Sequence, residues 1–409
     1  MFLKNYLLPF ALLCLLAACG QAPKQPAISQ NTIAIPDLLD RPEKVWYGTE
    51  WQGIQNRYAA NRDNILADSN DADAHIKLAE TFINEARITG EHGHYYPAAL
   101  QMLNGVLSKK ITDKDVLFRA LATKAGVQLS LHQFPEAKAS GEQAVALNPY
   151  NAQVYGVLVD ANVEMGQYDA AVHMADRMMS IRPDLRSYSR VSYLREIHGD
   201  AEGAIGAMEM AVQSGHPTLE ETAWAMLTLG ELYQNYGDPN KAITVFETTL
   251  LHRPGHPFAI GALANIYLEK KEYERAETLL KEAMAIIPEV GFYMDLARLY
   301  KTTGRILEAT KLTDEILTML QEDLDSGHNM NLELADVYAH FKNDYETALE
   351  YALTEYRIRP ENIDVNRQLA LLYSEMGDWE KAAEYATVAA STNSRHPELL
   401  ALSKAISMK

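Results

Sequence analysis

Apolar residues recur along this chain at helical spacing, in units that repeat about every 34 residues. In one unit, Leu263-Ala264-x-x-Tyr267 is followed by Ala276 and, at the end of the unit, by Pro288. Leu, Ala and Tyr at this spacing share one face of a helix, and the small alanines allow a second helix to pack closely on that face. Proline does not continue a helix, so Pro288 closes the unit. The pattern predicts two antiparallel helices in each unit.

An alanine near the start of the second helix marks nine such units. These ladder alanines are Ala99, Ala137, Ala171, Ala204, Ala242, Ala276, Ala309, Ala348 and Ala382. Their successive separations are 38, 34, 33, 38, 34, 33, 39 and 34 residues, so the spacing is modulated every third unit. A period of this length predicts a solenoid, in which each unit packs on its neighbours. The modulation arranges the nine units as three triplets.

The residue five positions before the ladder alanine is predicted to end the first helix of most units. It is glycine in five units and a larger residue in three others: Gly166, Gly199, Gly237, Gly304 and Gly377, then His132, Lys271 and Asn343. A helix commonly ends at a residue in the left-handed conformation, which glycine adopts without a side-chain penalty. We therefore expect tight turns at these positions, with the three larger residues as poorer caps.

These residues resemble the tetratricopeptide repeat family, whose pattern is Trp-x-x-Leu-Gly-x-x-Tyr, then Ala-x-x-x-Phe-x-x-Ala, then Pro. In the unit that matches best, Leu229-Gly230-x-x-Tyr233 precedes Ala242-x-x-x-Phe246. The resemblance implies an all-α, right-handed superhelical solenoid of about nine helical hairpins over residues 70–395, with the first helices lining the inner face. Residues 37–69 and 396–409 are then expected to be helical caps at the two ends.

The amino terminus has the pattern of a secretory signal. Lys4 is followed by an apolar stretch over residues 6–18, which is too short to span a bilayer. Residues 16–19, with the sequence LAAC, resemble a bacterial lipobox, and this resemblance implies removal of the signal peptide 1–18 and lipidation of Cys19. The alternative is a plain signal peptide that is cleaved elsewhere. Residues 19–36 are rich in Pro, Gln, Ser and Ala and predict a flexible tether behind the lipidated residue.

Charge and cysteine content narrow the partners. The chain has 37 basic and 55 acidic residues, and removal of residues 1–18, which include Lys4, leaves a net charge of about −19. Such a surface repels phosphate backbones, so nucleic acid is not expected as a partner. Of the two cysteines, Cys14 lies in the signal and Cys19 is acylated, so no disulfide is expected. Membrane attachment is expected through Cys19 alone, since an acidic surface gains nothing from anionic lipid.

A search for chemistry in the sequence finds few candidates. No phosphate loop, nucleophile elbow, HExxH or CxxC motif occurs, so neither an enzyme nor a cofactor is expected. The densest histidine segment holds His92 and His94, next to Glu91, in an insertion that lengthens the first hairpin. Imidazole and carboxylate groups suit zinc and related ions, which makes His92 and His94 the weak candidates for a metal site. In the alternative interpretation they are exposed loop residues.

The resemblance places the binding surface on the concave, inner face of the first helices. At the family's inward-facing positions in the middle triplet, the candidate protein-binding residues are Arg186, Ser189, Tyr193, Glu196, Trp224, Leu227, Glu231, Phe258 and Asn265. Aromatic and arginine side chains are the types that dominate binding hot spots. The alternative for Trp224 and Phe258 is that they pack between neighbouring hairpins as core.

Residues 182–196 hold four arginines interleaved with tyrosines, which is unusual in an acidic chain. Such a run suits an acidic peptide, a carboxylate or a glycan phosphate. In the alternative interpretation the arginines pair internally with acidic residues nearby, namely Asp184, Glu196, Asp200 and Glu202.

These expectations combine into one functional hypothesis. The sequence predicts a membrane-anchored, non-catalytic scaffold or adaptor that binds a protein or peptide partner in a bacterial cell-envelope complex. Because Gly20 rather than Asp follows Cys19, the lipobox resemblance favours the outer membrane. The alternative is an envelope carrier or sensor that binds a metal, a glycan or a small ligand in the concave groove.

Overall fold

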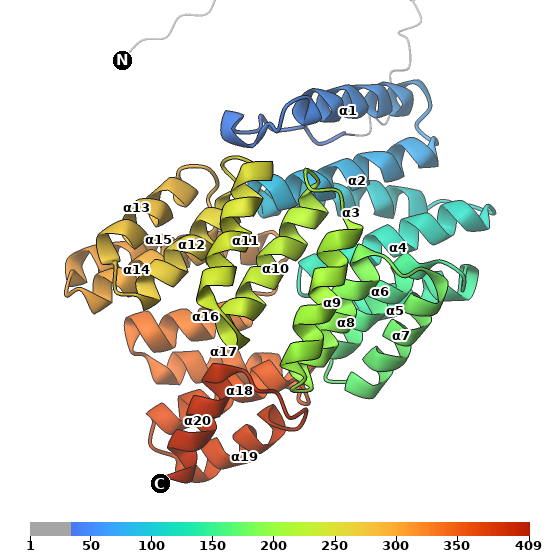
Figure 1. Cartoon of the computed structure of the whole chain (residues 1–409). Coiled ribbons are helices and arrows are strands. Elements are labelled where there is room, and N and C mark those ends of the chain that lie inside the picture. The colour runs from blue at the N-terminus through green and yellow to red at the C-terminus, as the bar shows by residue number, and fades with distance from the viewer. Residues whose placement is uncertain (1–33) are drawn as a thin grey trace, which may run out of the picture. The chain divides into compact units, whose positions relative to one another are not determined.

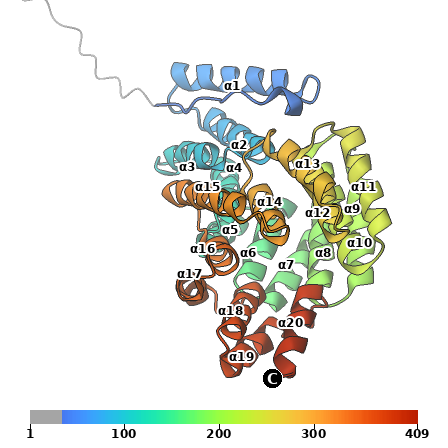
Figure 2. The same ribbon diagram turned by 90° about the vertical axis from the view of Figure 1, so that its left-hand side faces the viewer.

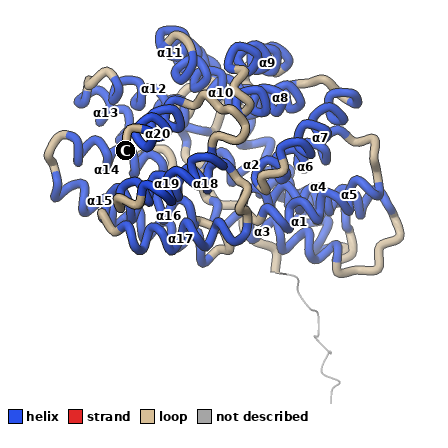
Figure 3. Tube along the Cα trace, turned by 90° about the horizontal axis from the view of Figure 1, so that it is seen from below, coloured by secondary structure: helices blue, strands red, loops and turns tan. Residues whose placement is uncertain are grey.

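The computed structural model describes residues 34–409, of which Ile35–Lys409 form one compact unit. Within this part of the chain every regular element is a helix (Figures 1 and 3), which confirms the predicted all-α class. The expected signal peptide 1–18, Cys19 and most of the tether 19–36 lie outside the described residues. No helix in residues 34–409 is long and apolar enough to cross a bilayer.

Nine helical hairpins, numbered here in chain order, follow one another between Ala72 and Ala389 of the described chain. Their first helices are α2 (Ala72–Thr89), α4 (Lys114–Ser130), α6 (Ala152–Glu164), α8 (Leu185–Ile197), α10 (Glu220–Tyr236), α12 (Pro257–Glu269), α14 (Val290–Thr302), α16 (Asn331–Val337) and α18 (Ile363–Glu375). Their second helices are α3 (His92–Leu107), α5 (Phe134–Leu147), α7 (Tyr168–Ile181), α9 (Ala201–Ser214), α11 (Pro239–His252), α13 (Tyr273–Met284), α15 (Ile306–Asp325), α17 (Tyr345–Ile358) and α19 (Trp379–Ala389).

Four further elements complete the described chain. A short 3₁₀ helix (Glu43–Val45) and α1 (Glu50–Ala67) precede the first hairpin, a π-helical turn (Tyr338–Lys342) extends α16, and α20 (Pro397–Ser407) follows the ninth hairpin. The extended residues before the 3₁₀ helix are tied to the fold, because the Tyr58 hydroxyl donates to the Pro36 carbonyl at 2.9 Å. The chain is therefore already ordered at the end of the segment that the sequence predicts as a tether.

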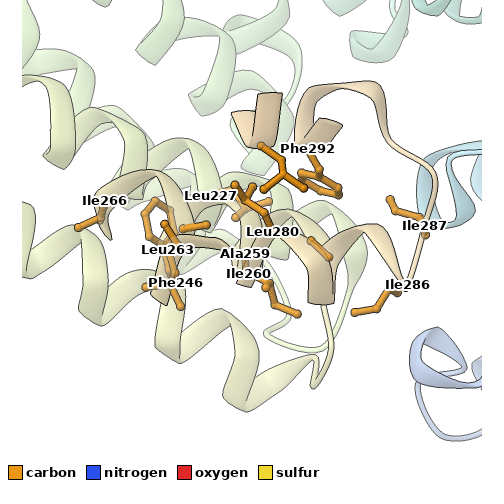
Figure 4. Packing of buried hydrophobic residues seen from close by; sticks show 14 of the residues in the cluster. Leu227, Phe246, Ala259, Ile260, Leu263, Ile266, Leu280, Ile286, Ile287 and Phe292 are labelled. Carbon is orange, nitrogen blue, oxygen red and sulfur yellow. The ribbon is translucent and has the colours of Figure 1, made fainter. Parts of the chain in front are cut away.

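The ladder alanines are buried in all nine hairpins, and none has more than 3% of its surface exposed. They allow the helices to approach, and larger side chains fill the remaining space between them. Figure 4 shows this packing for Leu227, Phe246, Ile260, Leu280 and Phe292, which come from five consecutive helices and belong to one buried cluster. This layer of apolar side chains runs through the middle hairpins and holds neighbouring hairpins together.

The turns between the two helices of each hairpin follow the prediction with one exception. Gly166, Gly199, Gly304 and Gly377 have φ between 72° and 80°, and His132, Lys271 and Asn343 adopt the same left-handed region with φ between 52° and 60°. Gly237 differs, with φ −140°, and there the Asp238 side chain caps α11 by accepting from the Asn240 amide. The turn of hairpin 5 therefore lacks the left-handed residue that the turns of the other hairpins share.

The first helices lie on the inner side of the curved array. First helices of neighbouring hairpins pack directly on each other, as in α4 on α6 and α10 on α12, whereas successive second helices make no comparable contact within the described chain. Elements that are closer together lie at the smaller radius of a curved stack. The first helices therefore line the concave face, as the family resemblance implies.

The solenoid curls until its later hairpins return to its earlier ones, a feature that the sequence does not predict. We call the residues between the two helices of a hairpin its turn, and those that follow its second helix its connection. The turns of hairpins 1 to 4 pack on the connections of hairpins 6 to 9, and we call this contact the seam. Figure 2 shows the result where α15 lies beside α3. The residues that meet are separated by about 195 positions in the sequence.

Four successive joints make up the seam. Gly90 packs on the Ile287 side chain, and His132 Nδ1 lies 3.0 Å from the Asn329 carbonyl oxygen. In the third joint the Tyr168 hydroxyl accepts from the Ile363 amide at 2.8 Å. The glycines of turns 3 and 4 fit against backbone, because a Cβ at Gly166 would lie 2.5 Å from the Glu361 carbonyl carbon and one at Gly199 would lie 2.4 Å from the Asn393 oxygen. Glycine is required at these two turns for space as well as for its positive φ.

Two buried arginines hold the seam and the amino-terminal cap in place. Arg359, in the connection of hairpin 8, pairs with Glu355 of its own hairpin and with Glu164 of hairpin 3, and it stacks 4.6 Å from the Phe134 ring of hairpin 2. Arg253, in the connection of hairpin 5, pairs with Glu50 at 3.2 Å and lies 3.6 Å from the ring of Tyr47. Glu50 and Tyr47 precede the first hairpin. The amino-terminal cap therefore packs on the connection of hairpin 5 in the way that the turns of hairpins 1 to 4 pack on the later connections.

Candidate binding surface on the first helices

Polar side chains link neighbouring first helices across the concave face. Arg190 of α8 makes two hydrogen bonds to Asp160 of α6, at 2.9 and 2.6 Å, and Gln234 of α10 donates to Glu269 of α12 at 2.6 Å. The Arg–carboxylate pair is bidentate, a geometry that fixes both side chains. These links hold the wall of the concave face rigid, so its other side chains are presented from a fixed frame.

The arginine-rich run 182–196 is internally paired in the structure. The pairs are Arg182–Asp184, Arg186–Glu221, Arg190–Asp160 and Arg195–Asp200, with N···O distances of 2.9, 2.9, 2.6 and 3.2 Å. Two of these acids, Asp184 and Asp200, are among those that the sequence proposes, and the other two lie on neighbouring first helices. The predicted contact residue Arg186 is exposed but already holds a carboxylate. The run therefore stabilises the inner wall, and an acidic ligand would have to displace these carboxylates.

The structure divides the nine candidate residues by their exposure. Ser189 and Leu227 are 3% and 8% exposed, and Leu227 belongs to the buried apolar cluster, so the prediction that they offer contact surface is wrong for both. The reason is that their positions face the neighbouring helix of the stack. Phe258 is half-buried and packs on Phe292 at 5.6 Å, as the core alternative predicts. Trp224, by contrast, is 51% exposed on α10 and is not a core residue.

Two carboxylates without a paired cation in the described chain, Glu196 and Glu231, lie toward the C-terminal ends of α8 and α10. No cation among the described residues acts on the Glu231 carboxyl, whereas Glu196 of the neighbouring helix lies close enough to repel it. Partial removal of water from the Glu231 carboxyl, together with Glu196, raises the pKa of Glu231 to about 7. Glu231 is nevertheless exposed, since the concave face admits water while the hairpins around it exclude part of the bulk solvent. The arrangement favours a cation beside Glu231.

The ninth hairpin adds residues to this surface that the sequence reasoning missed. Asp364 of α18 acts electrostatically on Glu196 and on Tyr193 of α8, and both Asp364 and Glu164 raise the pKa of Tyr193, after burial as the main cause. Asp364 and α8 are more than 160 residues apart, and the seam brings them together. No local motif identifies Asp364, because only the curl of the solenoid places it beside hairpin 4.

Asn265, the last of the predicted contacts, is half-buried on α12 and bonds to Asp295 of α14. It belongs to the polar links between first helices. The surface that remains available on the middle hairpins is therefore formed by Trp224 and Glu231, with Tyr193 and Glu196 beside them. We call these four residues the concave patch.

The histidines of the first hairpin lie in a helix and not in a loop, which corrects the loop interpretation. They form the first turn of α3, which begins seven residues before Ala99, whereas the other second helices begin three residues before their ladder alanine. His92 stacks on Tyr96 at 5.3 Å, while His94 Nε2 lies 2.8 Å from the Asp37 carbonyl oxygen. The two rings therefore have separate surroundings. Within residues 34–409 no group of three or more His, Cys, Asp or Glu side chains is arranged to hold a metal ion.

Two hollows of about 680 and 600 Å³ flank the contact between the turn of hairpin 4 and the connection of hairpin 9, and His198 lines both. The linings are mostly polar and include Arg395 and Asn393 of that connection. None of the nine predicted contact residues lines either hollow. These spaces are therefore a property of the seam and are distinct from the concave patch.

Comparison with known proteins identifies the repeats. Models described as tetratricopeptide repeat match residues 128–195, 235–290 and 367–398. The cellulose synthase operon protein C of Pseudomonas fluorescens (strain SBW25) is 23% identical over 165 residues, which cover 38% of this chain. The match spans only 13% of that relative's length. Together with the nine hairpins, the family matches show that the chain contains tetratricopeptide repeats.

Solved structures with a similar fold come from varied proteins. Human IFIT1, in a dimer with PPP-AAAA, has 13% identity and a TM-score of 0.48, with coverage of 85% of this chain and 87% of that chain. The APC/C hetero-tetramer Cut9-Hcn1 has 13% identity, a TM-score of 0.45 and coverages of 88% and 74%. Pseudomonas aeruginosa pilF has 16% identity, a TM-score of 0.39 and coverages of 65% and 98%.

Proposed function

We propose that this solenoid of tetratricopeptide repeats is a lipid-anchored, non-catalytic scaffold that holds a protein segment against its concave patch in a bacterial cell-envelope complex. Repeats of this type are in general scaffolds for protein–protein interaction. The observation that carries the proposal is Trp224, a large aromatic side chain that is half exposed in a wall otherwise fixed by polar links. Tryptophan is among the residues that most often dominate binding energy.

The chemistry of the patch specifies the kind of segment. Trp224 offers an apolar face to an aliphatic or aromatic side chain. Glu231 lies seven residues from Trp224 along α10, and Glu196 lies on the adjacent α8. A lysine or arginine of the partner would supply the missing cation, and it would lower the pKa of Glu231 on binding. We therefore propose a partner segment that combines a basic residue with an apolar one.

Attachment and location are the second part of the proposal. The pattern around Cys19 supports lipidation, and two or more acyl chains on one residue give stable anchoring. Gly20 after Cys19 supports delivery to the outer membrane. Ile35 packs on the fold, so in this proposal the segment between Cys19 and Ile35 links the acyl chains to the repeats.

Removal of the Trp224 side chain is expected to abolish recovery of the partner. The experiment isolates the tagged full-length chain from its native cells after mild crosslinking and identifies what accompanies it. Trp224→Ala is expected to lower recovery of the specific partner by at least tenfold, because hot-spot residues contribute about 2 kcal/mol or more. Leu251→Ala is the matched control, since Leu251 is exposed on the second helix α11.

A third variant separates the anchor from the patch. Cys19→Ser is expected to shift the chain from the membrane fraction to the soluble fraction. The concave patch around Trp224 keeps its structure in this variant. If Trp224→Ala and Leu251→Ala retain the same partners, the binding surface is not the concave patch. If the Cys19→Ser chain stays in the membrane fraction, lipidation at Cys19 is not the anchor.

A further inference from the structure

The seam joins two kinds of edge, a row of turns and a row of connections. Elsewhere in the described chain both kinds of edge occur again, and there they pack on no second edge of the described chain. In the seam, turns of early hairpins face connections of later ones. The turns of the later hairpins and the connections of the early hairpins therefore point away from the seam in opposite directions. A Cβ at Gly304 or Gly377, in the turns of hairpins 7 and 9, would meet no atom within 4 Å, in contrast to Gly166 and Gly199. We call these the free turn edge and the free connection edge.

The free turn edge carries apolar side chains at the position that makes contact in the seam. After turns 2 and 3 the first residue of the second helix, two positions after the left-handed residue, reaches across the seam: Phe134 stacks on Arg359, and the Tyr168 hydroxyl accepts from the Ile363 amide. After turn 7 the same position, the first residue of α15, is Ile306, which is 57% exposed, and its neighbour Leu307 is 86% exposed. Two adjacent aliphatic side chains in water, at a position built for packing, indicate a contact that the described chain does not make.

The free connection edge shows the matching feature. In the connection of hairpin 8 the residue after Pro360 is Glu361, whose backbone packs on Gly166. In the connection of hairpin 2 the residue after Pro149 is Tyr150, and 77% of its surface is exposed. Tyr150 thus occupies the position that Glu361 occupies in hairpin 8, where the connection meets a turn. It carries a large ring where Glu361 carries a carboxylate.

We infer that the free turn edge of one copy docks on the free connection edge of a second copy, with Ile306 and Leu307 packed against Tyr150, so that chains associate head to tail. The contact repeats between molecules the turn-to-connection packing that the seam makes within one molecule, and this continuity identifies the occupant as a second copy. The two edges are different surfaces, so the interface is heterologous and does not close on itself at two copies. The inference is independent of the concave patch, because none of its residues belongs to that patch.

The test measures the association of the full-length chain by sedimentation equilibrium in density-matched detergent micelles. The parent is expected to form a series of species beyond dimers as concentration rises. Leu307→Glu and Tyr150→Glu each place a charge in the contact and are expected to weaken self-association at least tenfold. Met210→Glu, on the exposed face of α9, is the matched control and is expected to behave like the parent.

A mixture of the two variants gives the decisive result. The Leu307→Glu chain keeps an intact connection edge, and the Tyr150→Glu chain keeps an intact turn edge, so an equal mixture is expected to form dimers and nothing larger. A parent that is monomeric over the whole concentration range would overturn the inference. So would a parent dimer that persists in either single variant, because a symmetric interface does not depend on these two edges. Circular dichroism of both variants confirms that their helices are intact.

Discussion

Replacement of Arg359 by methionine is expected to open the seam while the hairpins stay folded. Arg359 is 5% exposed, and the change leaves the carboxylates of Glu355 and Glu164 without their cation. Glu355 is 1% exposed, and an uncompensated buried charge costs about 3 to 5 kcal/mol. The seam is the weaker structure, because each of its joints is a short contact between a turn and a connection, whereas each hairpin buries apolar side chains along the length of two helices. The lost free energy is therefore expected to separate hairpin 3 from hairpin 8 and to leave each hairpin folded.

Amide hydrogen exchange measures this opening at the seam. The amides of the turns of hairpins 2 and 3, and of the connections of hairpins 7 and 8, are expected to exchange at least a hundredfold faster in Arg359→Met, and those within α10 to α13 at the parent rate. Arg305→Met is the matched control, since Arg305 also pairs with two glutamates and stacks on a tyrosine, but at the surface. Exposed pairs contribute about 1 kcal/mol or less. Equal exchange in both variants would show that Arg359 does not hold a seam.

Replacement of Ala276 by arginine is expected to unfold the middle of the solenoid. Ala276 is fully buried on α13, so the new side chain has neither space nor a partner for its charge. Overpacking costs about 1 to 3 kcal/mol, and an unpaired buried charge adds several more. Because each hairpin depends on its neighbours, the loss spreads to hairpins 5 and 7 rather than staying in one helix.

The loss at Ala276 is measured by urea unfolding with far-ultraviolet circular dichroism. Ala276→Arg is expected to show an early transition in which part of the helical signal is lost at low denaturant. Thr278→Arg, two residues further on the exposed face of the same helix, is expected to unfold like the parent. Parent-like unfolding of the Ala276 variant would mean that the ladder alanines do not mark the contact between the helices.

The hairpins were predictable because their determinants are local. The ladder alanines, the turn residues and the closing prolines all act within one unit or between neighbours, so the spacing along the chain is enough to place them. His132, Lys271 and Asn343 show how strong this constraint is, since each adopts the left-handed turn although none is glycine. Gly237 departs from the pattern, since α10 continues up to Tyr236, the residue directly before it, and Pro239 already begins the next helix.

The concave patch was predictable only in part. Family positions place Trp224 and Glu231 on the inner face, and the structure leaves both exposed. The same positions include Leu227, which is buried. The reason is that a helix in a curved stack has a narrow inner stripe, and a residue one position aside faces the neighbouring hairpin. Spacing alone does not resolve this difference, because it depends on how tightly the solenoid curls.

The seam was not predictable from the sequence, since its contacts join residues about 195 positions apart. Arg253 and Arg359 each stand before a proline at the end of a second helix, and both are buried. Arg182 stands in the same context before Pro183 but is exposed, because its connection belongs to the free edge. The motif is identical in the three places, and only the superhelical turn decides which of them meets a partner.

A photocrosslinker in place of Trp224 shows directly whether a partner segment lies on the concave patch. A benzophenone side chain is introduced at position 224 of the full-length chain in native cells, with position 251 as the control site on a second helix. We expect one dominant crosslinked protein from position 224, attached through a segment that contains a basic residue, and none of it from position 251. Crosslinks from position 224 only to a range of abundant proteins, or to the same partner as from position 251, would show that the concave patch does not hold the partner segment.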